Sequence, residues 1–297
     1  MKIIKSSVMF IPQPAGLEGV YKQVELAGRT AYKSEDKITD VSAKKFVKML
    51  MNKKHGAALE HGTIYLKYRC KWEGDNLTEF YEKNPYSNVI AKLNKDDYEN
   101  GWAMSTFYIT TNYRVIVENN RSQDLKYLSN PCKYHEKRYT FKFILSAGIG
   151  REFCRHRVFS FLQESTRYCN YSKDKFGGVS FISSVECPLE IGEYKVNNKM
   201  EIIKDGKVYL SKKELMCLSQ DKVLLYAYCN SEHLYLSLLD KGMKPQIARD
   251  VLPLGLKTEL IMTGTKKQWE EFINLRCAND AHPDARILAD EVKKILL

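Results

Sequence analysis

The chain has 297 residues, and 47 Lys and Arg against 36 Asp and Glu give it a formal net charge of +11. With 44% hydrophobic and 11% aromatic residues it can bury a core, which excludes an intrinsically disordered protein. Its apolar runs fall well short of the about 20 residues of a transmembrane helix, and Lys5, Ser6 and Ser7 interrupt the first of them, so no secretory signal is assembled. We therefore expect a cytoplasmic protein that binds no membrane.

The first half of the chain predicts two helices followed by strands. Apolar residues recur at helical spacing between residues 15 and 56, with the second helix starting near Asp40 or Ser42 and ending before Gly56. Alternating or β-branched and aromatic residues predict strands over 63–68, 107–117 and 139–145. Residues 71–103 are poor in aliphatic side chains, which indicates an excursion from the core.

The second half predicts mainly helices. They are expected over 149–156, over 211–239, from Pro245, from Thr265 and over 283–296. Gly242 is placed to close the long one, and Thr265 with Gln268 three residues later has the capping-box pattern. With the sheet strands in the first half, the pattern predicts an α+β protein with a single domain over 1–297 and an insertion at about 70–138.

The densest polar cluster is the segment 155–168, which holds three arginines, one histidine, two serines and one glutamine. Guanidinium groups match phosphate oxygens in pairs, and hydroxyl groups can donate to the remaining oxygens, so the composition suits a phosphate ligand. A solvated basic surface loop is the alternative for an arbitrary cluster of this kind.

The order of these residues is more specific than their composition. Arg155-His156-Arg157, then Ser165, then Arg167-Tyr168 resembles the signature of flavin-dependent thymidylate synthases. Two further segments are similar to motifs of that family, in the family's order: Glu-His-Gly-Thr at 60–63, and Ala-Arg-Asp-Val-Leu-Pro-Leu at 248–254 followed by Phe-Ile-Asn-Leu-Arg at 272–276. A weaker similarity covers 27–32, and most of 70–138 has none.

The resemblance implies a fold, an assembly and a reaction. The fold is a central, mostly antiparallel sheet flanked by helices, assembled as a homotetramer with nucleotide sites at the subunit interfaces. The reaction is reductive methylation of dUMP to dTMP, with methylenetetrahydrofolate as carbon donor, FAD as cofactor and NADPH as reductant. The family binds FAD without a Rossmann domain, so the lack of a dinucleotide-binding glycine motif agrees with it.

Arg276 is the predicted catalytic residue. On a helix begun at Thr265 it shares a face with Trp269, Phe272 and Ile273, and a cation in an apolar stripe is costly unless it meets an anion. An arginine whose stem packs while its head reaches water is the alternative. The resemblance implies that Arg276 stabilises the ionised uracil ring of dUMP.

The resemblance also implies the binding residues. Flavin contacts are expected from His61, Thr63, Arg155, His156, Arg157, Gln163, Thr265, Lys267 and Glu271. Contacts with dUMP are expected from Glu152, Arg155, Gln163, Glu164, Ser165, Thr166, Arg167, Arg249 and Arg276.

Four positions depart from the family pattern. Glu152 stands where many members have Gln, and Thr265, Lys267 and Glu271 stand where an Asn, an Arg and a later Asn are common. Lysine keeps the charge of arginine but loses its planar fork. Whether Thr265, Lys267 and Glu271 keep the flavin contacts is therefore open.

Cysteine and serine chemistry is the first competing interpretation. Cys132 follows Pro131, and Cys154 adjoins Arg155, whose charge could lower a thiol pKa. No base stands near either at motif spacing, so ordinary thiols are favoured, and a binding role is favoured over a nucleophilic role for Ser165. The eight cysteines include no C-x-x-C pair, so we expect reduced thiols and no metal site.

A basic protein that binds single-stranded nucleic acid is the second competing interpretation. The charge of +11 and the tyrosines and phenylalanines near lysines, as in 94–98 and 133–142, would suit it. No helix-turn-helix, zinc-finger or RNP pattern is visible in the sequence. We therefore favour single nucleotides over a nucleic-acid strand as the anionic partner.

Overall fold

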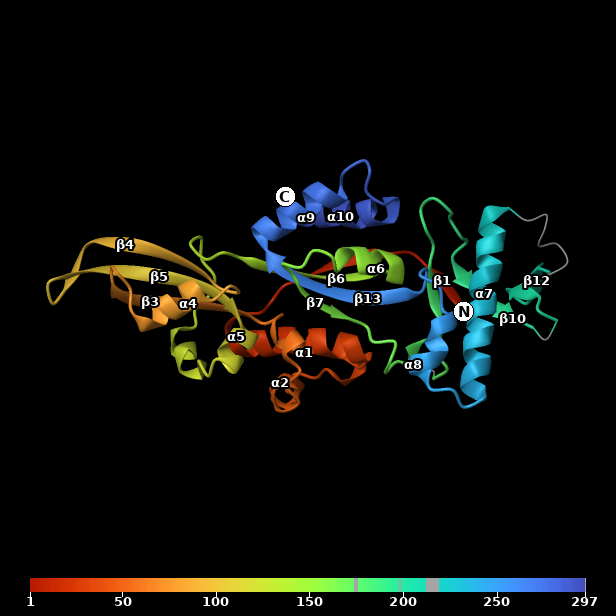
Figure 1. Ribbon diagram of the computed structural model, residues 1–297, viewed down its shortest axis with the longest axis horizontal. Coiled ribbons are helices and arrows are strands. Elements are labelled where there is room, and N and C mark those ends of the chain that lie inside the picture. Colours follow the sequence, from red (N-terminus) through yellow and green to blue (C-terminus); the bar gives the residue numbers. More distant parts are fainter. Residues whose placement is uncertain (174–175, 198, 212–218, 297) are drawn as a thin grey trace.

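A four-stranded antiparallel sheet forms the middle of the protein in the computed structural model, which describes residues 1–297 except 174–175, 198, 212–218 and 297 (Figure 1). Its strands are, in order, β2 (Ser7–Ile11), β6 (Arg138–Ser146), β13 (Lys257–Thr265) and β7 (Ser160–Gln163). β13 pairs with both β6 and β7, so it is a central strand with neighbours on both edges.

Helices cover one face of this sheet with an aromatic core. They are α6 (Ala147–Phe153), α9 (Lys266–Arg276) and α10 (Pro283–Leu296), drawn above the sheet in Figure 1. Phe141 and Phe143 of β6 alternate toward this side, where Trp269 of α9 packs edge-on against Phe141 with 4.8 Å between ring centroids. Such packing combines a large buried area with favourable ring geometry.

The opposite face of the sheet meets α1 (Gly16–Tyr32), which packs on α2 (Ser42–Asn52) and the short α3 (Gly56–Leu59). α1 buries Val20, Val24, Ala27 and Ala31, a spacing of three or four residues that places all four on one face. Gly62 lets the chain after α3 come close to α1, because a Cβ there would lie 2.7 Å from Val20 Cγ1 and 2.8 Å from Val24 Cγ2.

A buried ion network lies on this second face of the sheet. Glu259 of β13 accepts contacts from the ammonium groups of Lys33, Lys142 and Lys257, with Nζ to Oε distances of 2.7, 2.6 and 2.5 Å. Lys257 also pairs with Glu164, 2.8 Å away. Glu259 and Lys257 are 6% and 9% exposed, so the charges are tolerated inside the fold because each has a partner.

An antiparallel arm extends from one end of the molecule (Figure 1). It consists of β3 (Thr63–Lys71), α4 (Asn76–Lys83), β4 (Asn88–Glu99), β5 (Trp102–Asn112) and α5 (Tyr113–Glu118), with strand order β3-β5-β4. The predicted excursion over 71–103 therefore has regular structure. Tyr81 of α4 is fully buried and donates to Asp124, so the arm has packed contacts of its own.

The other end of the molecule is built around α7 (Gln220–Asp240). Two small sheets lie beside it, of strand order β8-β1-β9 and β10-β11-β12. Their strands are β1 (Lys2–Ile4), β8 (Ser180–Ile182), β9 (Gly192–Glu193), β10 (Lys195–Val196), β11 (Ile202–Lys204) and β12 (Lys207–Leu210). The short α8 (Pro245–Ala248) connects α7 back toward β13.

The predicted architecture of an antiparallel sheet flanked by helices is confirmed, and so are most helices. α2, α8, α9 and α10 lie where they were predicted, and the capping box is present because Thr265 accepts from Gln268 N while Gln268 accepts from Thr265 N. Gly242 follows α7 with φ of +84°, as a closing glycine should. The division into one domain with an insertion stays a prediction.

Three element predictions are wrong. β7 and β13 of the central sheet, and the short strands β8 to β12, lie in the second half of the chain, where no strand was expected. The charged residues Lys257 and Glu259 obscured β13. The strand predicted over 107–117 ends at Asn112, whose side chain accepts from Val115 N and starts α5. The long helix begins at Gln220 rather than 211, because residues 207–210 form β12; residues 212–218 lie outside the described part of the chain.

In the part of the chain that the structure describes, none of the helices is long and apolar enough to cross a lipid bilayer.

Glu259→Gln should lower the free energy of unfolding by about 3 kcal/mol, because three buried ammonium groups lose the anion that they share. Urea-induced unfolding at pH 7 measures this. Glu270→Gln is the control, since the pair of Glu270 with Lys266 is exposed and 3.6 Å long, and it should cost under about 0.5 kcal/mol. Equal losses in the two variants would contradict a structural role for the network.

The same network predicts how stability depends on pH. Burial by itself raises the pKa of Glu259, but the charge of Lys257 and hydrogen bonds from the three lysines outweigh burial and hold the pKa well below its usual range. A lowered folded-state pKa contributes stability above the usual carboxyl pKa, and that stability is lost as the pH falls. Between pH 6 and pH 3, Glu259→Gln should therefore lose less stability than the parent protein.

Candidate functional site

The predicted site residues lie on both faces of the central sheet. Glu152, His156 and Arg276 belong to α6, the turn after it and α9, on the face with the aromatic core. Ser165 lies after β7 and donates its backbone N–H to Ala31 O, 3.0 Å away, at the end of α1 on the other face. One copy of the chain therefore presents two partial sites.

Arg276 is held by three acceptors at the end of α9. Its Nη1 donates to Glu152 Oε2 at 2.8 Å, its Nη2 to the Glu152 backbone O at 2.7 Å, and its Nε to His156 Nε2 at 3.0 Å. A guanidinium has five N–H donors, so two remain for a ligand. The predicted cation at Arg276 is thus fixed in direction, with an acidic residue beside it.

His156 is neutral in this cluster. Burial first, and then the charge of Arg276, lower the pKa of His156 to about 4. Because Nε2 accepts from Arg276, the proton of the neutral ring is on Nδ1. The imidazole therefore acts as an acceptor for Arg276 and as a donor through Nδ1.

Arg155 and Arg157 flank His156 and point into solvent. Both residues are exposed, and neither guanidinium has an ion pair or hydrogen bond to another described residue. Two free guanidinium groups within three residues are suited to phosphate oxygens. Gln163 lies at the end of β7, beside Gly150 of α6, and its Nε2 donates to Thr258 Oγ1 at 3.2 Å.

The loop after β7 brings two separate motifs together. Arg249 Nη1 donates to Thr166 Oγ1 at 2.7 Å, which joins the segment 165–168 to the segment 248–254. Arg167 is exposed and lies 5.7 Å from the ring centroid of Tyr168. Arg249 and Arg167 thus place two cations near Ser165, and their contact with dUMP stays a prediction.

Glu164 is buried, and its carboxylate is fully engaged. It accepts from Lys257 at 2.8 Å and from Tyr171 at 3.0 Å, with 4% of the residue exposed. Its backbone N–H donates to Glu259 O. The side chain therefore fixes the loop after β7 to the sheet, and its contact with a substrate stays a prediction.

His61 and Thr63 are enclosed by protein. His61 is 0% exposed, its Nδ1 lies 2.8 Å from Thr263 Oγ1, and burial, then the charge of Arg138, lower its pKa to about 3. The backbone of Thr63 exchanges two hydrogen bonds with the Gln13 amide, of 2.7 and 2.8 Å. Their predicted flavin contacts are untested by this geometry.

The three α9 positions have different surroundings. Thr265 uses its hydroxyl to cap the helix, whereas Lys267 and Glu271 are exposed. An exposed carboxylate at 271 does not favour an anionic ligand nearby. Which of the three contacts a flavin stays a prediction.

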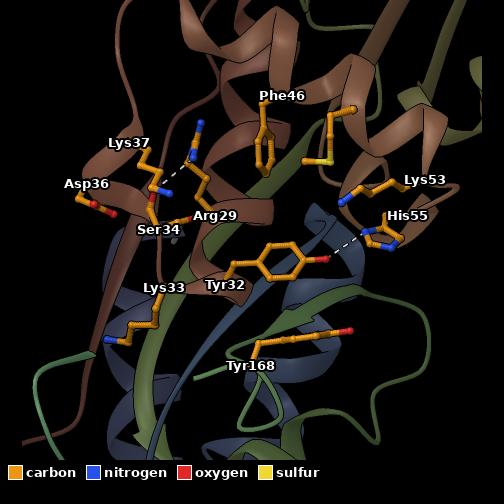
Figure 2. A pocket seen from close by; sticks show the side chains of 11 residues that line it. Arg29, Tyr32, Lys33, Ser34, Asp36, Lys37, Phe46, Lys53, His55 and Tyr168 are labelled. Carbon is orange, nitrogen blue, oxygen red and sulfur yellow. Dashed lines mark hydrogen bonds between the residues drawn. The ribbon is translucent and has the colours of Figure 1, made fainter. Parts of the chain in front are cut away.

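A cavity of about 780 Å³ opens where the loop after β7 meets α1 and α2 (Figure 2). Tyr168 and Tyr32 lie beside each other with 5.6 Å between ring centroids and a tilt of 53°, and the Tyr32 hydroxyl lies 3.0 Å from His55 Nδ1. Four cationic side chains and one acidic side chain also line it: Arg29, Lys33, Lys37, Lys53 and Asp36. Aromatic faces beside cations suit a flat ring that carries an anionic group.

Sequence reasoning missed most of this cavity. The weak family similarity over 27–32 was the available signal, since it contains Arg29 and Tyr32. His55 and Lys53 had no such signal, because they enter the site through the packing of α2 on α1.

The surroundings of Cys154 and Cys132 differ from those expected if either thiol were an activated nucleophile. Burial raises the pKa of Cys154, so a lowered value from its arginine neighbour is wrong. Cys132 Sγ does have a base nearby, His135 Nδ1 at 3.4 Å, which sequence spacing did not reveal. His135 is 5% exposed and its Nε2 donates to Leu66 O, so that pair belongs to the base of the arm.

Known proteins resemble this chain over most or part of its length. A family described as thymidylate synthase complementing protein matches residues 135–297, more than half of the chain. A flavin-dependent thymidylate synthase of Aquifex aeolicus is 22% identical over 94% of this chain and 95% of that protein. One of Synechocystis is 27% identical over 53% of this chain and 65% of that protein.

Solved structures also align with the chain. A UMP/dUMP methylase PolB from Streptomyces cacaoi, bound with 5-Br dUMP, aligns over 99% of this chain and 91% of that one, with 18% identity and a TM-score of 0.41.

Arg276→Met should raise the pKa of His156 above about 4, because removal of a neighbouring cation favours the protonated ring. Burial remains, so the value should stay below the usual one near 6.5. Histidine ring signals in an NMR pH titration measure it, with His282, in the turn before α10, as the internal control. An unchanged value for His156 would contradict the contact between the two residues.

Proposed function

This chain belongs to the thymidylate synthase complementing protein family, and from that premise we propose that it is a flavin-dependent thymidylate synthase. The reaction is the reductive methylation of dUMP to dTMP, with methylenetetrahydrofolate as carbon donor, FAD as cofactor and NADPH as reductant. The observation that carries the proposal is Arg276, a cation fixed in direction with two free donors.

Arg276 is assigned to the uracil ring. The ionised uracil ring carries negative charge, which raises the electron density at C5, the carbon that attacks the one-carbon unit. A preoriented donor pair stabilises that ionised ring without reorganising. Glu152 and His156 provide the orientation by occupying the other three N–H groups. The low pKa of His156 keeps its imidazole neutral, so Arg276 is the cation of this cluster that is assigned to the uracil ring.

The phosphate and base of dUMP are assigned to Ser165, Arg167 and Arg249. Ser165 lies in the loop after β7, which a backbone hydrogen bond anchors to α1. Arg249 is oriented by its hydrogen bond to Thr166. Ser165 has a binding role here, because no base and acid pair flanks it as a nucleophile would need.

The residues present fit FAD. Arg155 and Arg157 have free guanidinium groups for phosphate oxygens, and the cavity of Tyr32 and Tyr168 offers flat faces for a ring. Once bound, the reduced flavin supplies the hydride that completes the methyl group. The protein's part is to hold the rings and to exclude water from them.

The two faces of the sheet support a homotetramer with sites shared between subunits. Arg276 and Arg155 lie on one face, whereas Ser165 and Arg249 lie on the other. A site that uses both sets is completed by another copy of the chain. We place the enzyme in the cytoplasm, where reducing conditions suit the free thiols of the described cysteines.

Tritium release from 5-tritiated dUMP tests the proposal. Purified protein with FAD, NADPH and methylenetetrahydrofolate should release tritium as dTMP forms, and omission of any of the three should stop it. A colourless protein that takes up no FAD and binds single-stranded DNA at low salt would instead support the nucleic-acid alternative.

Arg276→Ala should lower dTMP formation by at least about 100-fold, the usual loss when one preoriented donor to developing charge is removed. FAD should remain bound, as measured by its absorbance after gel filtration. Arg286→Ala, in α10, is the matched control and should turn over normally. Normal turnover in Arg276→Ala would remove Arg276 from the mechanism.

Ser165→Ala should weaken dUMP binding by about tenfold and keep measurable turnover at saturating dUMP, because one neutral hydrogen bond is lost. Steady-state kinetics against dUMP separate the two effects. Complete loss of turnover with unchanged dUMP affinity would instead identify Ser165 as a nucleophile.

A further inference from the structure

A second cavity, of about 440 Å³, lies at the start of α1 and the beginning of β6. Its lining includes Lys137, Arg138, Thr63, Ser129 and Asn130, together with the first residues of α1. None of the described residues that line it is acidic. The cavity is therefore positively charged on one wall, with no carboxylate to balance it.

Arg138 has neutral hydrogen-bond partners. Its Nη1 donates to Glu60 O at 3.1 Å and to Thr63 Oγ1 at 3.5 Å, and its Nη2 donates to Ser160 Oγ at 3.1 Å. Among the described residues no carboxylate oxygen lies within 4.0 Å of the guanidinium, whereas Lys33, Lys142 and Lys257 each have one. Burial lowers the pKa of Arg138 to about 10, and the nearby Tyr65 and Glu60 only partly oppose that shift.

The N-terminus of α1 adds to the same cavity. Its N-cap residue is Ala15, and no side chain caps the first turn. Pro14, Ala15 and Gly16 line the cavity, whereas the acidic Glu18 of the first turn is exposed and does not. The uncapped N–H groups of a 17-residue helix carry partial positive charge and suit an anion.

Ser129 provides a further unused donor. Its Oγ is buried and has no hydrogen-bond partner. A buried hydroxyl without a partner loses the hydrogen bonds that it makes in water, so Ser129 leaves a donor unused just behind the wall of the cavity.

The cavity also adjoins positions predicted to contact the flavin. Thr63 lines it, and Arg138 is the cross-strand partner of Thr265. The chain has Lys267 and Glu271 where the family commonly has an arginine and an asparagine. Arg138 therefore lies beside Thr265, the residue from which α9 with Lys267 and Glu271 begins.

We propose that Arg138, Lys137 and the N-terminus of α1 form a phosphate site that binds the diphosphate of a dinucleotide cofactor. This rests on the proposed function, since that function brings two such dinucleotides, FAD and NADPH, to the protein. Arg138 replaces the arginine that the family pattern places on α9, and bidentate guanidinium contacts with the diphosphate offset the cost of its burial.

Arg138→Met tests the site by ligand binding. The dissociation constant for FAD, from quenching of flavin fluorescence, should rise at least about tenfold, the loss of one charge-assisted contact. Riboflavin, which lacks phosphate, should bind as in the parent protein. The dissociation constant for NADPH is measured in the same variant from the fluorescence of NADPH itself. The dinucleotide whose affinity falls is the one whose diphosphate occupies the site. Arg286→Met is the matched control and should change none of these values.

Asn130→Asp is the second variant, because Arg138→Met could fail to fold. Asn130 is exposed at the cavity, and the change keeps its shape while adding a negative charge. FAD or NADPH affinity should fall by about tenfold at low salt, and less in 0.5 M salt, since exposed charges are screened. Asn119→Asp, which lines a different cavity beside α5, should have no effect.

Unchanged affinities for both dinucleotides in Asn130→Asp and in a folded Arg138→Met would overturn the proposal. Failure of the proposed function looks different, because the parent protein would then bind neither flavin nor NADPH. In that case, titration calorimetry with inorganic pyrophosphate still tests the cavity: binding that Asn130→Asp weakens supports a phosphate site, and no binding refutes it.

Discussion

Glu259 and its three lysines hold together the parts of the chain on which the rest of the structure depends. The carboxylate lies in the central strand β13, and its partners come from the end of α1, from β6 and from β13 itself. Through Lys257 the network reaches Glu164, in the middle of the motif loop. Any other arrangement of these segments would leave buried charges without partners, which is costly. The ion network therefore specifies this arrangement more strongly than apolar contacts of the same area would.

The network explains why chemistry can lie on both faces of one sheet. On one side, aromatic packing of α9 against β6 fixes the helix that ends at Arg276. On the other, the ion network fixes the loop that carries Ser165. β7 connects the two, because Gln163 at its end faces α6 and the next residue enters the network. Two partial sites on a rigid sheet are the geometry that a shared interface needs.

Some cationic side chains are paired with carboxylates and others are not, and this difference distinguishes residues that stabilise the fold from residues to which we assign ligands. Lysines 33, 142 and 257 are paired with carboxylates, and they stabilise the fold. Arg155, Arg157 and Arg138 have no carboxylate within ion-pair distance among the described residues. Arg276 lies between these two groups: its guanidinium pairs with Glu152, which orients it, yet two of its N–H donors remain free. The net charge of +11 thus includes a small set of arginines without a carboxylate partner among the described residues, and these are the ones to which we assign anionic ligands.

The sequence by itself determined the family, the helices with clear caps and the residues of the motifs. Caps and motifs are local: Thr265 and Gln268 act three residues apart, and Arg155 to Tyr168 is one short segment. The tertiary structure alone decided that β13 is the central strand, that Glu164 is a buried ion-pair partner, and that Arg138 has no carboxylate. Each of these depends on partners far away in the chain, such as Lys257 for Glu164, 93 residues apart. A charged residue in a sequence does not reveal whether such a partner exists, because burial and pairing are set by how distant segments pack.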